Sequence, residues 1–200
     1  MSWFTVMAIV EGQGEEAAVP VLLRRMAAEI APEVWLDVPR PLRVPRGSLI
    51  ASNGLERYVE TAAERGGAGA GVLVLLDADD DCPAELGPRL LGRVQAARSD
   101  RRGSVVLAKR EFEAWFLASA PSLGGHRGLA KGLEVPADAE APRDCKGWLD
   151  ARRTDGRAYK PAADQAALAA VFDLRMAREN SPSFDKLWRD VARLLTGEER

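Results

Sequence analysis

Four carboxylates lie within five residues, directly after a strongly apolar stretch of the chain. Gly71 is followed by five aliphatic residues, and the sequence then continues as Asp77-Ala78-Asp79-Asp80-Asp81. An uninterrupted apolar run of this length predicts a strand that is buried on both faces of a parallel sheet. Because open α/β folds bind ligands at the carboxyl ends of their strands, these carboxylates are predicted to lie at a ligand-binding edge.

Asp77 and Asp79 are two residues apart, so in an extended segment their side chains project to the same side. Like charges at this spacing are unfavourable unless a cation lies between them, and a hard divalent ion with oxygen ligands is the usual partner. The alternative is an ordinary acidic turn, in which Pro83 begins the following helix. The motif alone leaves both interpretations open.

Two further groups of carboxylates follow predicted strands. Glu11 follows the apolar run 4–10, and Glu111 and Glu113 follow the run 104–108. If these strands are parallel, all the carboxylates share one edge of the sheet. Such a set of oxygen ligands suits one or two Mg²⁺ or Mn²⁺ ions, which bind phosphates, activate water and stabilise a leaving oxygen.

The elements that would position these residues alternate between strand and helix. Strands are predicted at 4–10, 34–38, 71–76 and 104–108, and helices at about 15–31, 54–65, 85–97 and from 109 onward. This alternation predicts an α/β fold with a mostly parallel four-stranded sheet and helices on both faces.

The chain changes character after residue 118, so we expect an α/β domain over 1–118 and an extension over 119–200 that packs on the same domain. A Gly/Pro-rich segment, 119–158, precedes helices predicted at about 161–178 and 184–195, the second capped by Ser183. The only histidine, His126, lies in the Gly/Pro-rich segment and is predicted to be a surface residue, which argues against Ser/His/Asp catalysis.

The composition restricts the partners of the protein. The formal net charge of −2 and the pI of about 5.6 give no overall basic surface for nucleic acid, although local arginine clusters remain available. The two cysteines lack zinc-site spacing and predict reduced thiols. No apolar run approaches the roughly 20 residues that cross a bilayer, so we expect a soluble cytoplasmic protein without membrane contacts.

The motifs resemble those of known proteins. Val10-Glu11-Gly12 and Asp77-Ala78-Asp79 resemble the Toprim domain, the metal-binding catalytic module of topoisomerases, bacterial primases and nucleases of the overcoming-lysogenization-defect type. More narrowly, the chain resembles the Toprim-like bacterial proteins of the DUF4276 group over nearly its whole length. The blocks that carry this resemblance are 10–16, 110–116, 159–161 and 181–184.

The resemblance implies roles for individual residues. Glu11 matches the Toprim glutamate, a metal ligand or general acid/base, and Asp77 and Asp79 match the pair that holds the metal. Asp81 extends this pattern, either as a ligand or as a helix cap. In the nuclease branch further carboxylates support a second metal, and Glu111 and Glu113 are the candidates for this role.

Three assignments stay open. On a helix, Glu111 and Glu113 would diverge by roughly 200°, so we expect only one of them to reach the metal, with Glu111 preferred and Glu113 available to an arginine. Glu15 is the next candidate for a second metal site. Lys160, in Tyr-Lys-Pro, either neutralises a phosphate or is an exposed loop lysine.

The expected function is therefore a Mg²⁺- or Mn²⁺-dependent phosphodiester hydrolase of Toprim type, with Glu11, Asp77, Asp79 and Lys160 as its catalytic residues. Its expected substrate is nucleic acid, with DNA favoured. Analogy with the overcoming-lysogenization-defect nucleases suggests a bacterial defence system with an ATPase partner, since this chain has no P-loop. The alternatives are a non-catalytic subunit that binds metal or nucleotide, and phosphotransfer on a small nucleotide.

Overall fold

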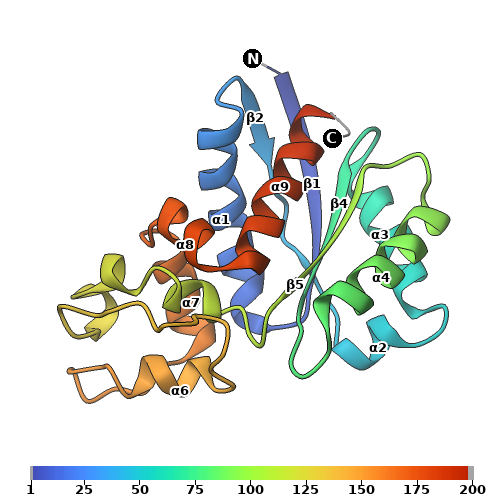
Figure 1. Ribbon diagram of the computed structural model, residues 1–200. Helices are drawn as coiled ribbons and strands as arrows, with labels where there is room; N and C mark the ends of the chain where they lie inside the picture. The colour runs from blue at the N-terminus through green and yellow to red at the C-terminus, as the bar shows by residue number, and fades with distance from the viewer. Residues whose placement is uncertain (1, 198–200) are drawn as a thin grey trace.

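The computed structural model describes residues 2–197 and has a parallel five-stranded sheet at its centre (Figure 1). The strand order is β2-β1-β4-β5, and the short strand β3 pairs with β1 beyond the end of β2. The strands are β1 (Ser2–Val10), β2 (Val34–Asp37), β3 (Leu42–Arg43), β4 (Gly71–Asp77) and β5 (Gly103–Ala108). The predicted α/β fold is confirmed, with β3 as an additional strand that follows β2 in the chain.

Helices cover both faces of this sheet. They are α1 (Gln13–Ile30), α2 (Arg46–Ile50), α3 (Gly54–Gly66), α4 (Pro83–Ala97), α5 (Ala114–Leu117), α6 (Cys145–Asp150), α7 (Pro161–Ala169), α8 (Leu174–Asn180) and α9 (Pro182–Thr196). Two short 3₁₀ turns, Ala120–Leu123 and His126–Gly128, lie between α5 and α6.

The sheet separates two apolar clusters. Alternate residues of β1 point to opposite faces, as strand geometry requires. Val6, Ala8 and Val10 join the cluster formed with α1 and α9, whereas Met7 and Ile9 join the cluster formed with α3 and α4. Figure 1 shows these two pairs of helices on opposite sides of the sheet. The first six residues of β4 are buried, as the aliphatic run predicts.

An aromatic cluster joins the segment after β5 to the C-terminal helices. Phe112, Trp115, Phe116, Phe172 and Phe184 contact one another with ring centroids 4.8–5.6 Å apart. These edge-to-face and tilted contacts add to the area that the rings bury. Trp115 and Phe116 are fully buried, as expected of core residues.

Three local predictions are wrong. The helix predicted from residue 109 begins only at Ala114, because Arg110 has a left-handed φ of 65°. The stretch 161–178 forms two helices, and Asp173 caps the second by accepting a hydrogen bond from Met176 N. Ser181, rather than Ser183, caps α9 by accepting from Phe184 N at 3.1 Å.

Ser183 has a different role. Its Oγ accepts a hydrogen bond from the Trp115 indole at 2.9 Å and another from Lys109 N at 3.2 Å. The residue therefore links α9 to the end of β5, where the segment that carries Glu111 and Glu113 begins.

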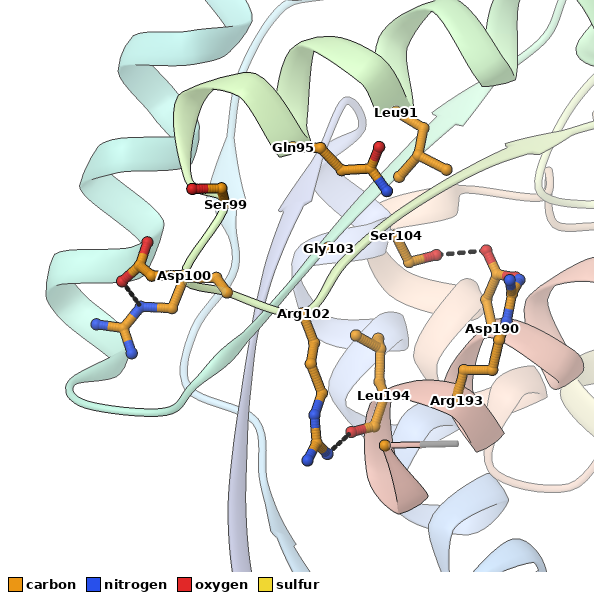
Figure 2. A pocket seen from close by; sticks show the side chains of 12 residues that line it. Leu91, Gln95, Ser99, Asp100, Arg102, Gly103, Ser104, Asp190, Arg193 and Leu194 are labelled. Atoms are coloured by element: carbon orange, nitrogen blue, oxygen red, sulfur yellow. Dashed lines mark hydrogen bonds and ion pairs between the residues drawn. The ribbon is translucent and has the colours of Figure 1, made fainter. Parts of the chain in front are cut away.

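Helix α9 is also fastened at the amino end of β5, beside a cavity of about 510 Å³ (Figure 2). Ser104 Oγ donates to the carboxylate of Asp190, and Arg102 Nη1 donates to Leu194 O at 2.7 Å. Asp190 is 2% exposed and also pairs with Lys186 and Arg193. Its charge is therefore compensated inside the fold.

The sequence also leads to expectations about the histidine, the two cysteines and membrane-spanning helices. His126 is exposed, and both cysteines are free, with Cys82 exposed and Cys145 buried. Within residues 2–197, no helix combines the length and the apolar character needed to cross a membrane.

Gly14 and Gly92 offer a matched pair of glycines inside helices. An added Cβ at Gly14 would lie 2.7 Å from Pro161 O and would overlap Gln165 Oε1, whereas a Cβ at Gly92 would meet nothing within 4 Å. We expect Gly14→Ala to lower the free energy of unfolding by about 1–3 kcal/mol, because it overpacks the contact between α1 and α7. Gly92→Ala should raise it by about 0.5–1 kcal/mol through helix propensity.

Urea unfolding of the two variants measures both effects. A Gly14→Ala variant as stable as the wild type would contradict the close approach of α7 to α1.

Candidate acidic site at the carboxyl ends of the strands

Strands β1, β4 and β5 are parallel neighbours, so their carboxyl ends meet at one edge of the sheet. A cavity of about 540 Å³, which we call the acidic cavity, opens there. Its wall contains residues that follow β1, the last residue of β4, and residues contributed by α6 and the start of α7. They are Glu11, Gly12, Gln13, Gly14, Glu15, Asp77, Lys146, Tyr159, Lys160, Pro161, Ala162 and Gln165.

Glu15 shapes the turn that places Glu11. Its Oε2 accepts hydrogen bonds from Glu11 N at 3.1 Å and from Gly12 N at 3.3 Å, the reach-back half of a capping box. The side chain is almost completely buried, and burial raises the pKa of Glu15 to about 7, with the nearby charges of Glu113 and Glu11 adding to the shift. Glu15 therefore has a structural role in this turn.

Asp77 joins the end of β4 to the segment after β5. Its Oδ1 accepts a hydrogen bond from Phe112 N at 2.7 Å, and its Oδ2 lies 4.0 Å from Lys146 Nζ. Burial raises the pKa of Asp77 well above its usual value, and the charges of Glu15 and Glu113 raise it further. The carboxyl is thus held in a place that disfavours its charged form.

Glu111 and Glu113 both reach the same lysine. Lys146 Nζ lies 2.7 Å from Glu111 Oε1 and 3.4 Å from Glu113 Oε2. Their segment is a turn rather than a helix, so the expected divergence of the two side chains is wrong. Glu113 is fully buried, and its Oε1 accepts from Tyr159 Oη at 3.0 Å and from Gln165 Nε2 at 2.9 Å.

Glu111 also anchors the short helix α6. Its Oε2 accepts hydrogen bonds from the backbone N–H groups of Cys145 at 2.9 Å and Lys146 at 3.2 Å. This arrangement places the Lys146 side chain between Asp77, Glu111 and Glu113. We call these three acidic residues and Lys146 the Lys146 cluster.

The ammonium of Lys146 is the cation of this cluster. Burial by itself would lower the pKa of Lys146, but the charge of Glu113, the hydrogen bond to Glu111 and the charge of Asp77 together raise it. The sequence gives no local signal for this residue, which lies in the Gly/Pro-rich segment. The only hint is that so many converging carboxylates require a cation.

Asp79 and Asp81 lie outside the acidic cavity. Asp79 has a left-handed φ of 49°, a conformation that Asp tolerates, so the expected common direction of Asp77 and Asp79 is wrong. The Asp79 and Asp81 side chains are 61% and 54% exposed and both face Arg46. Arg46, which also donates to the carbonyl of Asp77, is a second residue that sequence reasoning missed.

Lys160 is an exposed residue in the wall of the acidic cavity. It immediately precedes α7, and its backbone N–H donates to Asp164 Oδ2 at 2.9 Å. The structure therefore brings Glu11, Glu15, Asp77 and Lys160 into the wall of one cavity. Glu111 and Glu113 are outside this wall and form ion pairs with Lys146.

The oxygen atoms of the site suit a divalent cation in chemical type. In residues 2–197, three buried side-chain oxygens lack a hydrogen-bond partner, and all three belong to this site: Glu11 Oε2, Glu113 Oε2 and Gln165 Oε1. Carboxylate and amide oxygens are ligands of Mg²⁺ and Mn²⁺. As the side chains stand, no group of three or more His, Cys, Asp or Glu residues in this part of the chain is arranged to hold an ion. The ammonium of Lys146 lies among the carboxylates instead.

Comparison with known protein families identifies a match over most of the chain. A family model described as a domain of unknown function, DUF4276, matches residues 10–192. No curated protein and no solved structure matches the chain.

The raised pKa of Glu15 predicts how stability depends on pH. Between its usual value of 4.5 and the folded-state value of about 7, the folded protein binds more protons at this group than the unfolded chain does. The contribution of Glu15 to the free energy of unfolding therefore falls as the pH rises through this window, by up to about 3 kcal/mol. We expect Glu15→Gln to gain stability relative to the wild type from pH 5 to pH 8.

Urea unfolding across this pH range measures the difference between variant and wild type. Glu16→Gln is the matched control, since Glu16 pairs with Arg40 and Arg43 outside the acidic cavity. A difference between Glu15→Gln and wild type that does not change with pH would contradict the buried carboxyl.

Proposed function

Because the chain belongs to the DUF4276 family, a domain of unknown function, we propose its function from the geometry of the acidic cavity. The protein is a divalent-metal-dependent phosphodiester hydrolase that acts on nucleic acid, with DNA as the favoured substrate. The observation that carries this proposal is the gathering of three unpartnered buried oxygens among carboxylates at the carboxyl edge of the sheet.

Glu11, Asp77 and Glu113 are the residues that would hold the ion, with the Gln165 amide oxygen beside them. A bound Mg²⁺ or Mn²⁺ ion would supply Lewis acidity toward a phosphoryl oxygen and would make a water molecule easier to deprotonate, which yields a nucleophile for phosphorus. Carboxylates whose pKa values are raised by burial gain most from such an ion, because it compensates the charge that burial disfavours.

The other residues at the acidic cavity would orient the metal-binding carboxylates and bind the substrate phosphate. Tyr159 and Gln165 fix the carboxyl of Glu113 through hydrogen bonds, and Glu15 fixes the backbone of Glu11. Lys160 is exposed at the cavity wall, where its charge can offset that of a phosphate. Glu11 Oε2 lacks a partner and is available either as a ligand or as a proton acceptor.

The resemblance to Toprim domains supports the same activity. In that family, a glutamate after the first strand and aspartates after a later strand form the metal site, and here Glu11 and Asp77 lie at the same sheet edge. The further proposals rest on this resemblance alone: a cytoplasmic protein of a bacterial defence system, working with an ATPase partner.

A non-catalytic subunit that binds metal or nucleotide is the second candidate. Lys146 favours it, because this residue already compensates part of the carboxylate charge. The formal net charge of −2 also provides no general attraction for a nucleic-acid backbone.

Cleavage of supercoiled plasmid, linear duplex and single-stranded DNA, with Mg²⁺ or Mn²⁺ and with chelator, tests the proposal. Asp77→Asn keeps an acceptor for Phe112 N but removes the charge, so we expect metal-dependent cleavage to fall at least about 100-fold. Asp81→Asn is the control, since Asp81 faces Arg46 outside the cavity, and its activity should stay within about threefold of the wild type.

Equal loss in both variants would contradict the assignment of the acidic cavity as the catalytic centre. If the wild type cleaves none of these substrates although metal binds at the site, the non-catalytic candidate is supported instead.

A further inference from the structure

The Lys146 ammonium lies where carboxylate oxygens converge, 2.7 Å from Glu111 Oε1, 3.4 Å from Glu113 Oε2 and 4.0 Å from Asp77 Oδ2. We propose that Lys146 is a built-in counter-cation that a divalent ion displaces, so that the lysine and the metal alternate in the same cluster. This inference rests on the proposed function, because it requires a divalent ion at the site.

The charge balance of the site favours this exchange. A single ammonium contacts three carboxylates, and Glu11 and Glu15 lie in the wall of the same cavity. Carboxyl groups therefore outnumber the ammonium in a largely buried region, where each ionised carboxylate without a partner is costly. A divalent ion brings two charges and accepts several oxygen ligands at once, which one ammonium with three donors cannot do.

The Lys146 ammonium leaves some buried oxygen atoms at the site without a hydrogen bond. Glu113 is completely buried, and its Oε2 has the Lys146 ammonium within ion-pair distance but no hydrogen bond. The neighbouring Gln165 Oε1 is also buried without a partner. Both atoms could join a cation that binds at this position.

The side chain of Lys146 can leave without disturbing the fold around it. The backbone N–H groups of Cys145 and Lys146 hold Glu111 Oε2 independently of the ammonium. The Lys146 side chain is 37% exposed and forms part of the cavity wall, so its flexible four-carbon stem can turn toward the cavity. There the ammonium would lie on the same side as Lys160, where a substrate phosphate would bind.

Titration of Mg²⁺ and Mn²⁺ into the full-length protein by calorimetry tests the exchange. Lys146→Gln removes the competing charge and should bind either ion at least about tenfold more tightly than the wild type. Lys131→Gln removes an exposed charge that lies outside the acidic cavity and should change the affinity by less than about threefold. Lys146→Arg keeps a cation in the cluster and should bind no more tightly than the wild type.

These outcomes distinguish a failure of the proposed metal site from a failure of the proposed competition between Lys146 and the metal. Equal affinity in the wild type and Lys146→Gln would overturn the competition while the metal site stands. If none of the variants binds either ion, the proposed metal site fails and the competition fails with it.

Acetylation of lysines, followed by mass spectrometry, distinguishes displacement from a purely electrostatic effect on affinity. The Lys146 amine should react slowly without metal, since it is partly buried and ion-paired, and faster when Mn²⁺ saturates the site. Exposed Lys131 is the internal reference and should not change. Unchanged or slower acetylation of Lys146 in the presence of Mn²⁺ would overturn the displacement.

Discussion

The burial of several like charges at one edge of a parallel sheet is the constraint on which the rest of the structure depends. Three of these carboxylates accept hydrogen bonds from residues in another part of the chain, which offsets part of the cost of burying them. Asp77 holds Phe112 N, Glu111 holds the start of α6, and Glu113 holds Tyr159 and Gln165. The acidic residues therefore fasten the C-terminal part of the chain to the sheet, and the candidate site and the fold share the same interactions.

The features that could be predicted from the sequence are those that depend on local pattern. The aliphatic run before Asp77 predicts a buried strand because five aliphatic residues in succession, between a glycine and an acidic turn, are typical of a strand that is covered on both faces. The alternation of strands and helices then predicts a parallel sheet, and parallel strands bring Glu11 and Asp77 to one edge. No knowledge of distant contacts is needed for these steps.

The features that could not be predicted depend on contacts between distant residues or on single backbone angles. Lys146 meets Glu111 across 35 positions of the chain, and Gln165 meets Glu113 across 52. No periodicity encodes either pair. Asp79 itself has a left-handed φ, and its side chain pairs with Arg46 and lies outside the wall of the acidic cavity. Spacing in the sequence assumes a regular backbone, and the chain departs from regularity at this edge.

The choice of a lysine as the internal cation has a physical consequence. An arginine would bind a carboxylate through a planar fork, with two parallel hydrogen bonds that fix its geometry. The Lys146 ammonium is instead a compact charge on a flexible stem, and it makes one close contact, with Glu111 Oε1, and two longer ones.

Such a cation stabilises the folded chain by compensating charge, yet it leaves buried oxygens of Glu113 and Gln165 without hydrogen bonds. If the site served stability alone, the free energy of unfolding would be higher with hydrogen-bond partners for these oxygens, or with apolar side chains in their place, because buried unpaired acceptors cost free energy. Their retention beside an incompletely compensating lysine is the pattern that we expect of a site that a stronger cation completes.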